Sequence, residues 1–205
     1  MNINKLNRHW DSSRDDYSSR TSIMFQREHL KYLNDCKSII DLGCGNGQLV
    51  RRLRKAGKEA HGFTYNTDEV RSAVTKYAYY GDMHDIPSDD DVFEAFIMWD
   101  SLEHCQSAYI ALCEAKRVIR DNGKGLIFMP GQNWLDCHCH ICCYTVPQMK
   151  QLFKQAGLKL INVYEKKYPM NPTKYCEGMA VYEVMKYSEY APVFNSKGEL
   201  DAPDT

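Results

Sequence analysis

The chain has 205 residues, and its 26 basic and 27 acidic side chains give a net charge of -1 at neutral pH. This balance does not support nucleic-acid binding, because phosphate backbones are usually contacted by an excess of lysine and arginine. No apolar run is long enough to span a bilayer, and the first residues lack the apolar core of a secretory signal. Nine cysteines are an odd number in a chain that can fold without disulfides, so we expect reduced thiols in a cytoplasmic protein.

The first part of the chain is polar and is expected to lie outside the main domain. Residues 1–21 show no hydrophobic period, which favours an N-terminal arm. Trp10 and Tyr17 are equally consistent with a lid that closes over a ligand. Residues 22–35 then place apolar side chains on one face, which predicts an amphipathic helix.

Strands and helices are expected to alternate along the next part of the chain. Short apolar or β-branched runs bounded by turn residues predict strands, and longer runs with helical spacing predict helices. The expected strands are 38–42, 59–64, 78–82, 92–99 and 125–129, and the expected helices are 46–56, 67–77, 106–120 and 145–156, with a turn at 121–123. Alternating β-α units predict a parallel sheet covered by helices on both faces.

Two long strands, 158–168 and 175–187, are expected to close the domain. The connection between them is too short for a parallel crossover, so the pair should be antiparallel. The predicted fold is therefore α/β, a Rossmann-like doubly wound sheet of about seven strands, mostly parallel with an antiparallel C-terminal hairpin. We expect this domain to span residues 22–190, followed by a polar C-terminal tail at 191–205.

A glycine-rich turn follows the first predicted strand. Asp41 is followed by Gly43, Gly45 and Gly47 and then by a helical pattern. Glycine allows special backbone conformations and the close approach of a ligand, and ligands of open α/β sheets bind beyond the carboxyl ends of the strands. Position 48 is Gln, so the spacing differs from the G-x-G-x-x-G dinucleotide fingerprint, and no G-x-x-x-x-G-K-[ST] loop is present.

This acid-x-Gly-x-Gly-x-Gly pattern resembles the first motif of class I S-adenosylmethionine (SAM)-dependent methyltransferases. The antiparallel hairpin at the end is also similar to that family, and the resemblance spans about residues 36–187. In the family this turn wraps the methionine part of SAM. The resemblance therefore implies SAM contacts from Asp41, Gly43, Cys44, Gly45 and Gly47. The alternative is a glycine-rich turn in another kind of α/β protein.

The motif after the second strand departs from the family pattern. The family places an Asp or Glu there, which accepts hydrogen bonds from both ribose hydroxyls, whereas this chain has Thr64. A neutral hydroxyl makes weaker hydrogen bonds than a carboxylate. Either Tyr65 or Asn66 substitutes for the missing acid, or another residue reaches the ribose, or cofactor binding is weaker than usual.

The ends of the third and fourth strands resemble the adenine-binding part of the family. Asp82 resembles the acid that accepts from the adenine amine, Met83 is suited to pack on the ring, and His84 is its neighbour. Trp99, at the end of the fourth strand, is included with them as a cofactor contact. The alternatives are a turn-capping role for Asp82 and a core position for Met83.

The segment from 99 to 104 resembles the "leucine-glutamate-histidine" passage of small-molecule and sugar O-methyltransferases. His104 is a candidate general base, because histidine titrates near neutral pH, and Asp100 is a second candidate catalytic residue. Both residues are equally consistent with a structural role at the start of a helix.

Two histidines and four cysteines lie between residues 137 and 143. Cys139-x-x-Cys142 is an acceptable zinc pair, but a second pair is missing, so we predict no metal site. In the resembling family this connection shapes the acceptor pocket, which implies that His138 or His140 lines the substrate site as a base. A Cys–His nucleophile is a further alternative.

Together these motifs predict a SAM-dependent methyltransferase that methylates a small-molecule or sugar-type acceptor at oxygen. The expected partner is this acceptor, without membrane association. One alternative, suggested by Thr64, is a SAM- or nucleoside-binding protein without transfer activity. The other is a nucleic-acid methyltransferase, although the Asn/Asp-Pro-Pro-aromatic motif common in those enzymes is replaced here by Trp99-Asp100-Ser101-Leu102.

Overall fold

The computed structural model describes residues 29–130, 139–167, 177–187, 193–194 and 200–201. The expected arm with Trp10 and Tyr17 lies outside these residues. Of the expected helix 22–35, the described part comprises a helical end at 29–30 and the 3₁₀ turn η3 (Lys31–Leu33).

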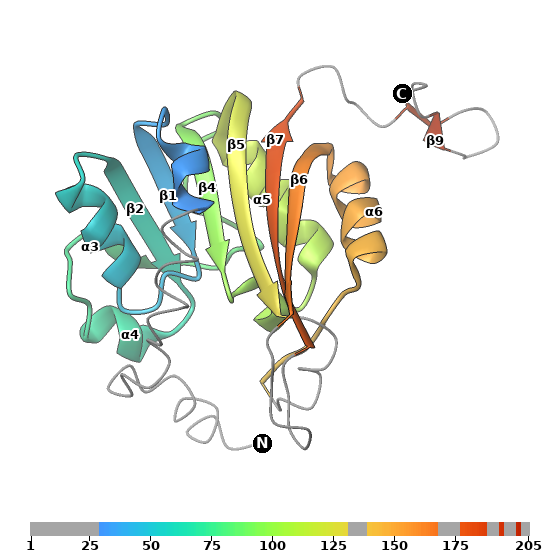
Figure 1. Ribbon diagram of the computed structural model, residues 1–205. Coiled ribbons are helices and arrows are strands. Elements are labelled where there is room, and N and C mark those ends of the chain that lie inside the picture. The colour runs from blue at the N-terminus through green and yellow to red at the C-terminus, as the bar shows by residue number, and fades with distance from the viewer. Residues whose placement is uncertain (1–28, 131–138, 168–176, 188–192, 195–199, 202–205) are drawn as a thin grey trace.

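Seven strands form one sheet in the order β3-β2-β1-β4-β5-β7-β6 (Figure 1). Their bounds are β1 Ser38–Leu42, β2 Glu59–Thr64, β3 Ala78–Tyr80, β4 Phe93–Trp99, β5 Ile119–Pro130, β6 Leu158–Lys167 and β7 Glu177–Lys186. The pairs among β1 to β5 are parallel, and β7 inserts antiparallel between β5 and β6. This arrangement confirms the predicted doubly wound sheet with an antiparallel C-terminal pair.

Helices cover both faces of the sheet. The bounds are α3 Gln48–Lys55, α4 Thr67–Arg71, α5 Ala108–Val118 and α6 Val146–Ala156, with a second 3₁₀ turn, η4, at Leu102–His104. In β4, Phe96 and Met98 join the core cluster under α5 and α6, whereas Ile97 joins the cluster under α3 and η3. Successive side chains of a strand point to opposite faces, so two covered faces explain why β4 is almost continuously apolar.

The helix expected at 67–77 ends early, at Arg71. Asn66 caps its start by accepting a hydrogen bond from the backbone of Asp68 at 2.9 Å. Ser72 Oγ then bonds back to the Asp68 carbonyl at 2.8 Å, and the backbone N–H of Val74 donates to the carbonyl of Asn46 instead of to a helical partner. The prediction was wrong because these tertiary and side-chain bonds replace the helical ones.

The turn expected at 121–123 is instead a bulge inside β5. Phe93 pairs with Ile119 and Ala95 pairs with Lys124, so the residues between them bulge out opposite Glu94. Asn122 has a positive φ of 60°, which matches its turn-like sequence, but the strand continues on both sides. The expected helix 106–120 accordingly ends at Val118.

Two smaller expectations also need correction. The third strand stops at Tyr80 rather than at Asp82. Within the expected polar tail, β8 (Val193–Phe194) and β9 (Leu200–Asp201) pair with each other as an antiparallel ladder. Among the described helices, none has the length and apolar character needed to cross a membrane.

Candidate active site

The glycine turn between β1 and α3 lies at the carboxyl edge of the sheet (Figure 1). The backbone N–H groups of Gly43 and Cys44 both donate to the carbonyl of Phe63 in β2, at 2.9 and 3.0 Å, which ties the turn to the neighbouring strand. The φ angles of Gly43, Gly45 and Gly47 are 84°, 54° and 82°. All three lie in the left-handed region that favours glycine. Backbone atoms, rather than side chains, therefore line this turn.

Cys44 places its side chain in the core and not in the turn. It belongs to the cluster that includes Val50 of α3, and burial raises the pKa of its thiol well above the usual range. Any contribution of Cys44 to a ligand therefore comes from its backbone.

Ser101 closes the turn from the β4 side. Its hydroxyl donates to the Leu42 carbonyl at 2.7 Å, which joins the ends of β1 and β4. A Cβ placed on Gly43 would lie only 2.3 Å from the Cβ of Ser101. The sequence analysis did not single out Ser101, and its only signal is its place directly after a strand next to β1.

Two buried carboxyl groups lie at the ends of these adjacent strands. Asp41 is 2% exposed, and the Oδ1 atoms of Asp41 and Asp100 are buried without a hydrogen-bond partner within the described part of the chain. Burial raises the pKa of Asp41 to about 7. Burial also raises the pKa of Asp100, although a hydrogen bond from Trp99 acts in the opposite direction. Carboxylates in such surroundings are normally satisfied by a positively charged or hydrogen-bonding group.

Asp100 also holds an unusual backbone conformation. Its φ is 44°, one of three positive values at described residues other than glycine. Side chains with a Cβ seldom adopt this conformation, and it concentrates at functional sites. The strained conformation of Asp100 therefore marks the segment between β4 and η4 as a candidate part of the site.

A carboxylate from α4 lies beside position 64, where the sequence lacks an acid. Thr64 is 5% exposed, and its hydroxyl donates to Glu69 Oε2 at 2.5 Å. The other oxygen, Oε1, lies 3.8 Å from the position that a Cβ on Gly45 would occupy. Burial raises the pKa of Glu69, and the hydrogen bond from Thr64 lowers it. The sequence analysis missed Glu69, whose signal is an acid in the first turn of a helix capped by Asn66.

Tyr65 directly follows Thr64, and its side chain is exposed to solvent. Its side chain is 72% exposed, and its ring centroid is 6.1 Å from that of Tyr80 at the end of β3. An exposed pair of aromatic rings at the carboxyl edge of a sheet offers a flat apolar surface for a planar ligand.

The loop after β3 is organised by Asp82 and His84. Asp82 Oδ1 accepts hydrogen bonds from the backbone N–H of His84 at 2.9 Å and from ring Nδ1 at 2.6 Å. His84 Nε2 accepts from the backbone of Ser107 at 3.1 Å, so the neutral ring carries its proton on Nδ1. Burial raises the pKa of Asp82, but the bonds from His84 outweigh it and the net pKa is lowered. The pair thus fixes the loop against the start of α5.

Met83 and Trp99 lie on opposite faces of the sheet. Met83 packs on the core cluster under α5 and α6, and its Cε is 3.6 Å from the Cβ position at Gly43. Trp99 packs on the other core cluster and stacks on Phe128 with ring centroids 3.6 Å apart. Met83 is therefore a neighbour of the glycine turn, whereas Trp99 makes its main contact with the core.

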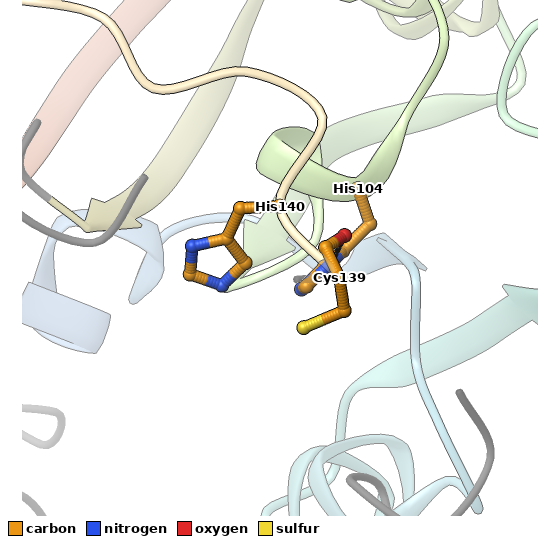
Figure 2. A group of neighbouring side chains, drawn as sticks. All are labelled: His104, Cys139 and His140. Atoms are coloured by element: carbon orange, nitrogen blue, oxygen red, sulfur yellow. Dashed lines mark hydrogen bonds between the residues drawn. The ribbon is translucent and has the colours of Figure 1, made fainter. Parts of the chain in front are cut away.

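Two of the three candidate histidines lie together. His104 comes from η4 and His140 from the loop before α6, and their ring centroids are 4.9 Å apart (Figure 2). His104 Nδ1 is 2.9 Å from the Cys139 carbonyl. The loop is held on η4 because the backbone N–H groups of Ile141 and Cys142 both donate to the Glu103 carbonyl. His138 lies outside the described residues.

Residues 40–127 match the model of a family described as a methyltransferase domain. This range contains the glycine turn, Asp82, Asp100 and His104. A solved SAM-dependent methyltransferase from Methanosarcina mazei superimposes with a TM-score of 0.64 at 16% identity, covering 77% of this chain and 95% of that one. Residues 40–127 carry a methyltransferase domain, and the sheet around it has the fold of a SAM-dependent methyltransferase. The cofactor of this domain is SAM.

Other comparisons set the limits of this likeness. The fold of the methyltransferase domain is shared with the YcgJ protein of Bacillus subtilis, with a TM-score of 0.60 at 13% identity over 74% of this chain and 92% of that one. It is also shared with the [4+2]-cyclase SpnF, with a TM-score of 0.61 at 16% identity over 78% of this chain and 81% of that one. A curated relative, malonyl-[acyl-carrier protein] O-methyltransferase of Salmonella typhimurium, is 30% identical over 92 residues. That match covers 42% of this chain and only 36% of the relative.

The residues of the methyltransferase domain fit its cofactor. SAM carries a cationic sulfonium and an ammonium group, and the buried carboxyl groups of Asp41 and Asp100 suit these cations in their ionised form, which their raised pKa values place near neutral pH and above. Ser101 fills the side of Gly43 where a Cβ would lie, and Met83 Cε is 3.6 Å from the same position, so the turn excludes a side chain there.

Proposed function

We propose that this chain transfers the methyl group of SAM to a small-molecule or sugar-type acceptor, at an oxygen atom. The observation that carries the proposal is the pair of buried carboxyl oxygens of Asp41 and Asp100 beside the glycine turn. Two buried anionic groups next to a backbone-lined turn suit a cationic ligand whose charge offsets theirs.

Glu69 is assigned to the ribose of the cofactor. Its carboxylate is held by Thr64 and lies next to Gly45, so it replaces an acid at the end of β2 with one from the following helix. Met83, Tyr65 and Asp82 are assigned to the adenine of the cofactor. Asn66 is assigned an indirect role, because it caps the start of α4, the helix that carries Glu69.

Glu69→Gln is expected to weaken binding of S-adenosylhomocysteine about ten- to a hundredfold, because a hydrogen bond to a charged group contributes roughly 1.5–3 kcal/mol. Isothermal titration calorimetry measures the change. Asp68→Asn is the matched control, because Asp68 is on the same helix but its side chain pairs with Arg71 at the surface. An equal loss of affinity in Glu69→Gln and Asp68→Asn would contradict the assignment of Glu69 to the ribose. So would an equal loss in Glu69→Gln for an analogue of S-adenosylhomocysteine that lacks both ribose hydroxyls.

The cofactor supplies an electrophilic methyl group, and the protein has to align and deprotonate the acceptor. In the proposed step, His104 or His140 takes the proton of the acceptor hydroxyl. The oxygen then forms a bond to the methyl carbon as the sulfur–carbon bond breaks, which leaves neutral S-adenosylhomocysteine. The remaining histidine and the loop before α6 line the acceptor side, where His138 is also assigned by the resemblance.

His104→Ala is expected to lower turnover by about a hundredfold or more, the usual contribution of a positioned acid or base. Affinity for S-adenosylhomocysteine should stay nearly constant, because His104 lies on the loop side and not in the glycine turn. His61→Ala, which removes a half-buried ring of β2 that packs against Tyr77 and Tyr79, is the control. Unchanged turnover in His104→Ala would remove this residue from the catalytic assignment.

A second candidate function is cofactor binding without methyl transfer. It is favoured by the shared fold of SpnF, whose name is that of a [4+2]-cyclase, because this likeness shows that the fold alone does not determine the reaction. Incubation with methyl-labelled SAM and a cell extract that contains both metabolites and nucleic acids separates the two functions. Label in a small molecule supports transfer, label in RNA or DNA supports a nucleic-acid methyltransferase, and tight binding without labelled product supports the second candidate.

A further inference from the structure

We propose that His104, Cys139 and His140 together bind a divalent transition-metal ion of the zinc class. One ligand atom from each residue can be chosen such that all lie within 4.8 Å of one another. Figure 2 shows His104 descending from the η4 turn toward the loop that carries the other two, with the Cys139 sulfur on the side of the His140 ring. The proposal concerns metal binding and stands whether or not the chain transfers a methyl group. A histidine nitrogen that binds a metal cannot also accept a proton, so the metal-bound protein is a different state from the one in which His104 or His140 acts as the base.

The donor set is chemically suitable. Two imidazoles and one thiolate are ligands that zinc and its neighbours in the first transition row prefer, and zinc bonds to them measure roughly 2.0–2.3 Å. Ligand atoms on one tetrahedral ion are then roughly 3.5 Å apart. His140 is only partly buried, so rotation of its side chain shortens the present separation without a change in the core.

His104 already has the support that metal-binding histidines usually have. Its Nδ1 lies 2.9 Å from the Cys139 carbonyl, an acceptor, so the ring proton is on Nδ1 and the lone pair of the neutral ring is on Nε2. Metal ligands commonly donate their second ring N–H to a carbonyl in this way. The buried Glu103 carboxylate, 1% exposed, lies 3.7 Å from Nε2 and adds negative charge beside the proposed cation.

The two segments that carry the ligands are held together by backbone bonds. The N–H groups of Ile141 and Cys142 donate to the Glu103 carbonyl at 2.8 and 3.1 Å. His104 and Cys139, which are 35 residues apart in sequence, are therefore placed side by side by the fold itself. Less conformational entropy is lost on metal binding when the ligands are preorganised in this way.

The proposed ligand set differs from the Cys139-x-x-Cys142 pair that the sequence offered. The Cys142 thiol lies 3.6 Å from the Leu102 carbonyl and hydrogen-bonds with Cys105. His104, at the end of η4, supplies a further ligand in place of the missing second cysteine pair. Three protein ligands leave a coordination position for another molecule, as in catalytic zinc sites.

Titration of the full-length, metal-stripped protein with Co²⁺ tests the proposal. We expect visible d–d bands and a near-ultraviolet thiolate-to-cobalt band that saturate with one metal per chain and disappear when Zn²⁺ is added. Cys139→Ser should abolish the thiolate band, His140→Ala should weaken Co²⁺ binding at least tenfold, and Cys142→Ser should leave the band unchanged. Cys142→Ser is a matched control, because it removes a thiol from the same loop.

Three results would overturn the proposal: no saturable cobalt spectrum in the wild-type protein, an unchanged thiolate band in Cys139→Ser, or loss of that band in Cys142→Ser alone. Circular dichroism of each variant identifies any that fail to fold, and the partly exposed His140 then provides the decisive variant. Calorimetry with S-adenosylhomocysteine on the same samples keeps the outcome separate from that of the proposed methyl transfer, which does not require the metal.

Discussion

Replacing Gly43 with alanine is expected to abolish detectable SAM binding and to lower the unfolding temperature substantially. The new Cβ would lie 2.3 Å from Ser101 Cβ and 2.9 Å from its hydroxyl oxygen, far inside van der Waals contact. The φ of 84° adds backbone strain of about 1–2 kcal/mol for any residue with a Cβ. The clash with Ser101 adds roughly 1–3 kcal/mol to the destabilisation. The clash can be relieved only if the glycine turn or the end of β4 moves.

Gly57→Ala separates the two contributions. Gly57 follows α3 with a φ of 85°, and a Cβ there would meet no atom within 4 Å. This control therefore reports backbone strain alone, and its SAM binding should be unchanged. Thermal unfolding and calorimetry on both variants make the comparison, and Ser101→Gly in the Gly43→Ala background should restore part of the stability. Equal destabilisation by the two alanines would show that the contact between Gly43 and Ser101 is not tight.

Asp41→Asn is expected to weaken SAM binding strongly while it stabilises the protein at alkaline pH. The pKa of Asp41 is about 7 in the folded protein, compared with an ordinary value of 3.8. Between these values the folded chain keeps a proton that the unfolded chain has released, so the stability contributed by this group falls as the pH rises from 4 to 7. A pKa difference of about three units corresponds to a loss of about 4 kcal/mol in the free energy of unfolding. Asn has no proton to lose in this pH range, so the variant does not suffer this loss.

The same titration controls cofactor binding. The ionised carboxylate is the form that attracts the cationic SAM, so affinity in the wild-type protein should rise as the pH increases through about 7 and then level off. In Asp41→Asn this rise should be reduced and the affinity should remain low. Thermal unfolding and calorimetry between pH 5 and 9 measure both effects. A variant that is less stable at pH 8 and binds SAM normally would contradict the assigned role of Asp41.

Most of the fold could be predicted from the sequence because its signals are local. Apolar runs such as the one around Ile97, bounded by turn residues, define strands, and the short connection after the sixth strand requires an antiparallel pair. The helix from Thr67 was predicted too long because the bond between Val74 and Asn46 is tertiary. The bulge at Asn122 was missed because a turn-like sequence does not reveal that both flanking segments pair with the same strand.

In the candidate site, too, residues with a local sequence signal could be predicted and residues that depend on tertiary contacts could not. Asp41 and the glycines lie within one motif, so the sequence identifies them. Glu69 was missed because its approach to Thr64 depends on where α4 begins. Ser101 was missed because its partner Leu42, although on the adjacent strand, is far away in the sequence. The sequence predicts no metal site because it lacks a second cysteine pair, and the proposed set of His104, Cys139 and His140 comes together only through the fold.

Calorimetric titration of the wild-type protein with SAM at pH 8 tests the central claim most directly. The account predicts a single saturable binding site, lost in Gly43→Ala and weakened in Glu69→Gln. No binding heat and no thermal shift at millimolar SAM would contradict it, as would binding that neither substitution alters.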